Sequence, residues 1–165
     1  PWKDRLFVGS PTGLQIFNNT DPAHPVYESM FSHATGCDPV VCDENNAYVT
    51  IHSGTGCGGT FNQLDIVDIR NLPIANNVKS YPMTSPMGLA VTDEHLFVCD
   101  DGLKIYDKSN PLDLDLKKHY KNLKTYDVIA FSDDHLMVVG DAGFYQFDVS
   151  DPSDPKQISL IPVVK

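Results

Sequence analysis

The sequence predicts an all-β fold, a β-propeller built of four-stranded antiparallel blades, and three observations lead to it. A short apolar strand recurs four times, a second strand follows each copy, and a turn rich in Asp, Asn and Pro follows each second strand. The 12 prolines and 11 glycines lie along the whole chain of 165 residues and leave no room for long helices. A four-stranded sheet that repeats about every 40 residues is typical of propellers, in which neighbouring sheets bury each other's faces.

The first strand of each copy is the clearest part of the repeat. The copies begin at residues 6, 47, 96 and 136, which are 41, 49 and 40 residues apart. They read Leu6-Phe7-Val8, Ala47-Tyr48-Val49, Leu96-Phe97-Val98 and Leu136-Met137-Val138. The second strands cover residues 14–17, 64–68, 103–107 and 144–148, and Gly13, Gly102 and Gly143 stand before three of them. Glycine at that position permits the positive φ of a tight turn between two strands.

The turns and two further strands complete each unit. Asp68, Asp107 and Asp148 end second strands, where such side chains cap nearby backbone amides. Third strands are expected to begin near Val26, Val78, Leu114 and Gln157, and fourth strands to cover residues 39–42, 87–91 and 126–131. The one segment that could form a helix, residues 114–123, is in register with the third strands and is therefore predicted as strand and turn.

The number of blades leaves two arrangements open. The chain is predicted to be a single partial propeller domain, residues 1–165, with repeats at about 5–46, 47–95, 96–135 and 136–165. The first copy lacks its leading strand, since Arg5-Leu6 already belongs to the second strand of a blade. The chain could close alone as a four-bladed ring, or form half of a larger ring that upstream sequence or a second copy completes. The absent strand and the absent initiator Met favour the half-ring and a piece of a longer protein.

Composition narrows the classes of partner. The net charge is −10, which disfavours non-specific binding to nucleic acid or to anionic lipid. The acidic surface would suit a cationic partner, but solubility alone explains it equally well. The longest apolar run, Leu136 to Val139, is far shorter than the roughly 20 residues of a membrane-spanning helix.

Several strands and turns resemble those of a known family. Leu-Asp-Ile-Val-Asp at 64–68, Leu-Lys-Ile-Tyr-Asp at 103–107 and the segment 147–155 resemble the LVIVD repeat. The segments 37–41, 47–50, 57–59 and 62–65 are similar to a subgroup from Bacteroidetes-type bacteria, and the whole chain resembles the C-terminal half of such proteins. The resemblance implies a propeller and an extracytoplasmic setting, as a secreted or outer-surface lipid-anchored protein. It implies no particular activity, because a shared fold does not name a function.

The second repeat carries an insertion, residues 52–61, that is rich in glycine and accounts for the long spacing. Phosphate-binding glycine loops join a strand to a helix, whereas this loop joins two strands. Cys37 and Cys57 are expected at the same end of the blade, where a disulfide would fix the insertion in an oxidising compartment. Cys42 and Cys99 lie within strands and are expected to be buried free thiols.

Metal sites are weak alternatives in this sequence. Zinc could use His33, Cys37, His52 and Cys57, but the short Cys-Cys spacing of common structural sites is absent. Calcium could use Asp100, Asp101 and Asp141, but no EF-hand ligand pattern is present. No metal or other cofactor is therefore expected.

Two functions remain open. The first is a non-catalytic cell-surface binding or scaffold module, which meets a protein or glycan at the propeller rim through Tyr126, Asp127, Phe61 and His52. The second is a hydrolase or lyase with its site at the central channel, where the inner strands offer Asp38, Thr125, Tyr126 and Asp127. The sequence shows no local catalytic set, although such sets can assemble from distant segments, and the binding module is favoured.

Overall fold

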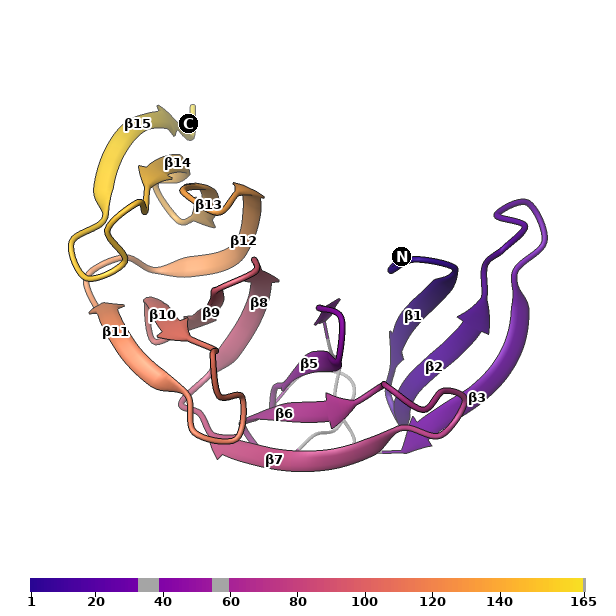
Figure 1. Cartoon of the computed structure of the whole chain (residues 1–165). Helices are drawn as coiled ribbons and strands as arrows, with labels where there is room; N and C mark the ends of the chain where they lie inside the picture. Colours follow the sequence, from indigo (N-terminus) through magenta and orange to yellow (C-terminus); the bar gives the residue numbers. More distant parts are fainter. Residues whose placement is uncertain (33–38, 55–59, 165) are drawn as a thin grey trace. The chain divides into compact units, whose positions relative to one another are not determined.

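The structure of the chain, a computed structural model, describes residues 1–32, 39–54 and 60–164. The described residues form 15 strands joined by turns, with no helix among them. The strands form four antiparallel sheets, each a meander of consecutive strands (Figure 1). This confirms the predicted all-β fold of about four propeller-type blades. The described residues accordingly contain no helix that is long and apolar enough to span a membrane.

The chain divides into two compact units, Pro1–Met83 and Thr84–Lys165, and each contains two sheets. The sheets of the N-terminal unit consist of β1 (Arg5–Ser10), β2 (Gly13–Asn18) and β3 (Val26–Ser32), and of β4 (Val40–Cys42), β5 (Asn46–Ile51), β6 (Gln63–Asp68) and β7 (Asn76–Pro82). The sheets of the C-terminal unit consist of β8 (Pro86–Val91), β9 (His95–Asp100), β10 (Leu103–Asp107) and β11 (Asp115–Tyr120), and of β12 (Thr125–Ser132), β13 (His135–Gly140), β14 (Gly143–Asp148) and β15 (Lys156–Pro162).

The strand predictions agree closely with these bounds. The first sheet has three strands and lacks the leading strand that the other three sheets possess, as the sequence predicts. The segment at 114–123 forms strand β11 and a turn instead of a helix. The first strand of each complete sheet is the strand that the sequence pattern assigns to the end of the preceding repeat. The sheets are therefore offset by one strand from the repeats predicted from the sequence.

Each unit has its own apolar core between its two sheets. In the N-terminal unit, Phe7, Leu14 and Ile16 of the first sheet pack with Val49 and Val67 of the second. In the C-terminal unit, the core contains Ala90, Phe97, Cys99, Leu103 and Ile105 from the first sheet and Val128, Leu136, Val138, Tyr145 and Phe147 from the second. These side chains alternate along their strands with residues on the opposite face, as the pleat of a β-strand requires. Burial of apolar surface between sheets is thus the main force that holds each pair together.

The two sheets of the C-terminal unit approach most closely at Gly88. A Cβ atom at this position would lie 2.6 Å from the Cα of Asp127 on β12 and even nearer to its carboxylate. Only a residue without a side chain lets β8 and β12 come this close without a shift of backbone. The contact fixes β12 against β8 where the chain passes from one sheet to the next.

The aspartates that end the second strands cap their turns, as predicted. Asp68, Asp107 and Asp148 each accept a hydrogen bond from the backbone amide two residues later, at 2.9 Å. Hydrogen bonds from Arg70 lower the pKa of Asp68 to about 2, and those from Ser109 lower the pKa of Asp107 to about 2. These carboxylates are therefore structural groups that shape the turn between second and third strands.

Candidate functional site

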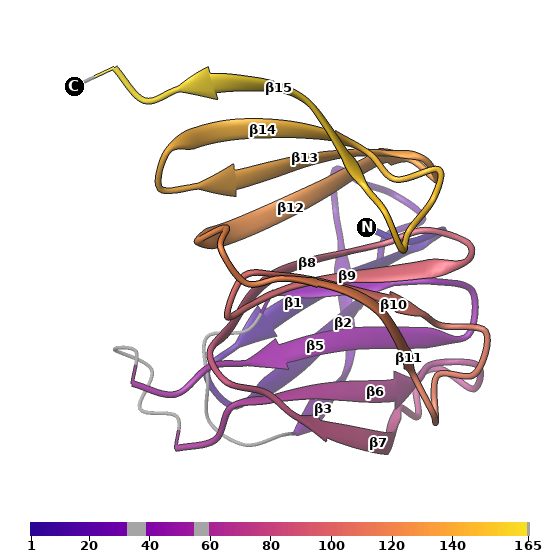
Figure 2. The same cartoon turned by 90° about the vertical axis from the view of Figure 1, so that its left-hand side faces the viewer.

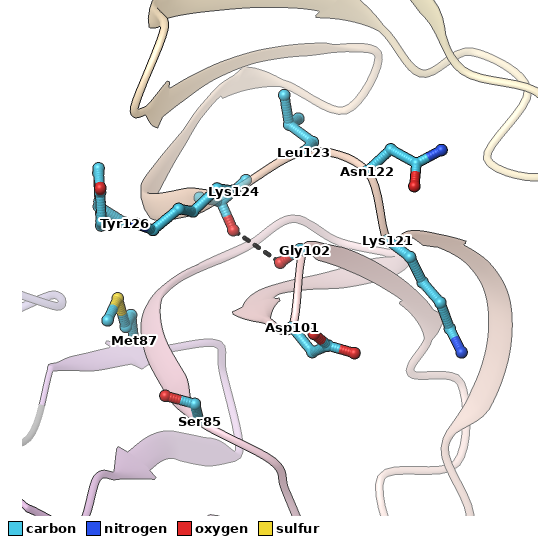
Figure 3. A pocket seen from close by; sticks show the side chains of 10 residues that line it. Ser85, Met87, Asp101, Gly102, Lys121, Asn122, Leu123, Lys124 and Tyr126 are labelled. Carbon is cyan, nitrogen blue, oxygen red and sulfur yellow. Dashed lines mark hydrogen bonds between the residues drawn. The ribbon is translucent and has the colours of Figure 1, made fainter.

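A cleft of about 260 Å³ opens in the C-terminal unit, where the chain crosses from one sheet to the other. Three segments line it, which are the start of β8, the β9–β10 turn, and the loop that leads from β11 into β12 (Figure 3). The lining residues are Ser85, Met87, Asp101, Gly102, Lys121, Asn122, Leu123, Lys124, Thr125 and Tyr126. A site built from turns on two packed sheets has a rigid support, while its side chains remain accessible.

The β9–β10 turn forms one wall of the cleft through an unusual backbone. Asp101 and Gly102 both have positive φ, at 50° and 114°. A Cβ atom at Gly102 would lie 2.0 Å from the carbonyl oxygen of Tyr120, so glycine is required by space as well as by φ. The prediction of a positive-φ glycine before the second strand is confirmed here.

A hydrogen bond joins this turn to the strand opposite. The buried hydroxyl of Thr125 donates to the carbonyl oxygen of Gly102 over 2.6 Å. Figure 3 draws this bond as the dashed line that ends at Gly102. The same carbonyl accepts the backbone amide of Asp100 at 2.9 Å. Thr125 thereby links the two sheets at the base of the cleft, and its hydroxyl is occupied by this role.

A buried carboxylate holds the remaining wall in place. Asp100 accepts hydrogen bonds from the backbone amides of Thr84 and Ser85, at 2.9 and 2.6 Å. It also forms an ion pair with Lys104, whose Nζ lies 2.6 Å from the carboxylate. Its side chain is fully buried, and that of Lys104 is only 14% exposed. Charge-assisted hydrogen bonds of this kind are strong, so they fix the segment that carries Ser85. The same donors occupy the oxygens that the calcium alternative would need from Asp100.

Two lysines and a tyrosine are among the exposed residues of the cleft, together with Asp101 and Asn122. Neither Lys121 nor Lys124 forms an ion pair within the described part of the chain. The Lys124 ammonium lies 5.8 Å from the centre of the Tyr126 ring, within reach of a cation–π contact. Tyr126 is itself exposed, and Figure 3 shows it at one end of the cleft with Met87 nearby. Lys124 thus offers a cationic donor beside the ring face of Tyr126, and Lys121 offers a second one at the opposite end of the cleft (Figure 3).

A second cleft, of about 280 Å³, lies in the N-terminal unit, and Trp2, Lys3, Arg5 and Glu44 are among its lining residues. Its cations are largely paired within the unit. Lys3 pairs with Glu44 at 3.1 Å, Arg5 with Asp4 at 3.0 Å and Arg70 with Asp68 at 2.5 Å. Because ligands must compete with these partners, the cleft at Tyr126 is the better candidate site.

The residues singled out in the sequence fall in different places. Tyr126 lines the cleft, whereas Asp127 lies beside it and accepts a hydrogen bond from the amide of Val128 at 2.9 Å. Phe61 and His52 lie in the other unit, so the four predicted binding residues do not form one cluster within a unit. Phe61 is exposed, and the Nδ1 of His52 is buried without a hydrogen-bond partner among the described residues.

The predicted disulfide and zinc site lie outside the described residues, since they depend on Cys37, Cys57 and His33. Asp38, named for the catalytic alternative, also lies outside them. Cys42 and Cys99 are free thiols, as expected, but only Cys99 is buried and Cys42 is half-buried. Burial raises the pKa of each to about 12. The described residues contain no group of three or more His, Cys, Asp or Glu side chains that could hold a metal ion.

Sequence reasoning missed the lysines of the cleft. Lys121 lies in the segment 114–123, which the sequence predicts only as strand and turn, and Lys124 directly follows that segment. The signal that could have found them is their position, since they lie in the connection between two blades directly before Tyr126. Loops at such connections are common places for binding residues on a rigid scaffold.

Comparison with known protein families agrees with the repeated sheets of the C-terminal unit. A family model described as LVIVD repeat matches residues 85–122 and 125–159. The chain contains LVIVD repeats. The two matched segments correspond to the two sheets of the C-terminal unit, so the cleft lies at the junction between two LVIVD repeats.

Solved structures support the fold of these repeats. A crystal structure of a functionally unknown protein from Desulfotomaculum acetoxidans DSM 771 superposes on the chain with a TM-score of 0.58 at 10% sequence identity. The match covers 97% of this chain and 67% of that one. At this identity the likeness concerns the fold alone. None of the curated proteins matches the chain significantly.

Proposed function

We propose that the chain is a non-catalytic binding or scaffold module at a cell surface, and that its partner, a protein or a glycan, binds in the cleft at Tyr126. The observation that carries this proposal is the contact of the exposed Tyr126 ring with Lys124, in a cleft that Lys121 also lines; neither lysine forms an ion pair within the described part of the chain. A ring face packs against apolar surface, and the two ammonium groups donate hydrogen bonds to hydroxyl, carbonyl or carboxylate oxygens. Binding sites commonly combine such an anchor with a few polar groups.

The rigidity of the site supports binding as well. The Thr125–Gly102 hydrogen bond and the buried Asp100 fix two walls of the cleft before any ligand arrives. A preformed site loses less conformational entropy when a ligand binds, which favours affinity. The LVIVD repeats thus provide a frame, and the connection between the two repeats provides the binding side chains.

A hydrolase or lyase is the second function that the sequence leaves open. Two of the residues named for it, Thr125 and Asp127, make hydrogen bonds to backbone groups within the C-terminal unit. Such bonds fit a structural role for these side chains and favour the binding function over a catalytic one.

Binding can be tested by probing an array of neutral and acidic glycans, and in parallel a displayed peptide library, with the purified chain. For the ligand found in this way, we expect Tyr126→Ala and Lys124→Ala each to weaken binding at least about tenfold, because both remove groups from the cleft. Lys117→Ala is the matched control, since Lys117 is an exposed lysine of the same unit that pairs with Asp115 outside the cleft. Equal binding by all three variants would remove the cleft from the proposed function.

An extracytoplasmic position, as a secreted or outer-surface lipid-anchored protein, belongs to the same proposal. Cys42 and Cys99 are free, so Cys37 and Cys57 are the remaining cysteines for a disulfide. We expect these two to resist alkylation until a reductant is added, in protein exported to an oxidising compartment, as read by mass spectrometry of the peptides. Full alkylation of both thiols without a reductant would contradict the disulfide.

A further inference from the structure

The connection between the two sheets of the C-terminal unit is the most basic segment of the chain. Residues 117–124 contain Lys117, Lys118, Lys121 and Lys124, and they contain no aspartate or glutamate. The whole chain has 12 lysines and arginines and a net charge of −10, so this segment differs sharply from the rest. In Figure 2 the chain passes along this segment from β11 into β12. We call residues 117–124 the basic segment.

The basic segment places two of its lysines in the cleft with their charges uncompensated. Lys117, which lies outside the cleft, pairs with Asp115 at 2.7 Å. Lys121 and Lys124 line the cleft, and neither forms an ion pair within the described part of the chain. The lining residues include a single carboxylate, that of Asp101. The cleft is therefore cationic on a molecule that is acidic as a whole, which favours an anionic ligand.

The positions of the two lysines favour a chain-like ligand over a small anion. Figure 3 shows Lys124 and Tyr126 at one end of the cleft and Lys121 at the other. A single carboxylate or phosphate can accept hydrogen bonds from one of these ammonium groups but does not reach both. A polymer with a negative charge on successive units can contact both lysines at once, and each contact is a charge-assisted hydrogen bond.

The other polar groups of the cleft favour a glycan over an acidic peptide. The Ser85 hydroxyl and the Asn122 amide both donate and accept hydrogen bonds, whereas the Asp101 carboxylate only accepts them. Sugar hydroxyls donate as well as accept, so they match all three groups, while acidic side chains at neutral pH only accept. A sugar ring also has an apolar face that can pack on the exposed ring of Tyr126.

We propose that the ligand of the cleft is a glycan chain that carries carboxylates, which is a chain of uronic acid units. The inference rests on the proposed binding function and narrows its ligand to one chemical class. One sugar ring packs on Tyr126, and the ammonium groups of Lys124 and Lys121 donate hydrogen bonds to carboxylates at the two ends of the cleft. The sugar hydroxyls bond to the remaining polar side chains of the lining.

Calorimetric titration of the purified chain with oligogalacturonate and with oligomannuronate tests the proposal. We expect at least one of the two to bind, and its methyl ester, which keeps the rings and hydroxyls but has no charge, to bind at least about tenfold more weakly. Raising the NaCl concentration from about 0.05 to about 0.5 M should also weaken binding of the free acid severalfold, because salt screens exposed charges.

Variants that change only the charge of the cleft give a second measurement. Lys121→Met and Lys124→Met keep much of the side-chain length and should each weaken binding of the oligouronate at least about fivefold. Lys121→Arg retains the charge and should stay within about twofold of the wild-type affinity. Lys117→Met is the matched control, since it removes a charge from the basic segment outside the cleft and should change affinity less than about twofold.

The outcomes separate this inference from the proposed binding function. Equal affinity for the free acid and the methyl ester, with a loss in Tyr126→Ala, would overturn the acidic ligand and keep the cleft as a binding site. Tighter binding of an oligoglutamate peptide than of either oligouronate would assign the cleft to acidic peptides and also overturn it. So would the absence of binding by both oligouronates, whereas the binding function itself fails only if cleft variants leave the binding of every array ligand unchanged.

Discussion

Asp100→Ala should lower the free energy of unfolding by about 3 to 5 kcal/mol, the usual cost of removing one partner from a buried ion pair. The substitution leaves the ammonium of Lys104 in a site that is only 14% exposed, without its carboxylate. It also leaves the amides of Thr84 and Ser85 without the oxygens that accept their hydrogen bonds. Urea denaturation at neutral pH measures the loss, from the shift in midpoint at constant slope.

Three further variants separate the charge from the hydrogen bonds. Asp100→Asn keeps one oxygen acceptor but removes the charge, so it should cost less than alanine. The double variant Asp100→Ala with Lys104→Met removes both charges and should recover part of the stability, since an apolar pair is often tolerated where a lone charge is not. Asp101→Ala, at the exposed neighbouring position, tests the backbone alone, because Asp101 has a positive φ of 50°. A loss for Asp100→Ala no larger than for Asp101→Ala would contradict a central role for the buried carboxylate.

The Asp100 network also has a consequence for the cleft. The amide of Ser85 bonds to Asp100 at 2.6 Å, and Ser85 lines the cleft. Ligand affinity should therefore fall in Asp100→Ala even though Asp100 itself does not line the site. The residue acts on binding through the backbone segment that it holds, which makes it a positioning residue.

The repeat made most of the fold predictable from sequence. Strands of period two, a glycine before the second strand and a capping aspartate after it recur in the copies, and each is a local signal with a local cause. The missing strand of the first sheet could be predicted for the same reason, because Arg5-Leu6 is in register with Ala47 in the second copy. Local signals that agree with one another specify a fold well.

The candidate site was less predictable, because it depends on contacts between distant segments. Tyr126 was identified as an exposed aromatic residue at the start of an inner strand, and the structure confirms its exposure. Asp100 was considered only as a calcium ligand, since nothing in the sequence pairs it with Lys104 across the β9–β10 hairpin. Nothing in the sequence indicates that Lys121 and Lys124 line the same cleft as the Asp101–Gly102 turn, because the fold brings these two segments together.

The second large effect should come from a comparison of two equivalent positions, Leu103 and Phe144. Leu103 is fully buried in the core of the C-terminal unit, so Leu103→Ala should lower the free energy of unfolding by about 3 kcal/mol through lost burial and a cavity. Phe144 occupies the same place in the next repeat but is 45% exposed. Phe144→Ala should cost less than about 1 kcal/mol, although it removes the larger side chain.

Urea denaturation of the two variants and the wild-type chain measures both values, from the shifts in midpoint at constant slope. Equal losses would show that Phe144 is already covered within the chain. Leu103 and Phe144 occupy equivalent positions in their repeats, so the sequence pattern alone does not distinguish them. A difference between the two losses would therefore measure the effect of the sheet that packs on Leu103.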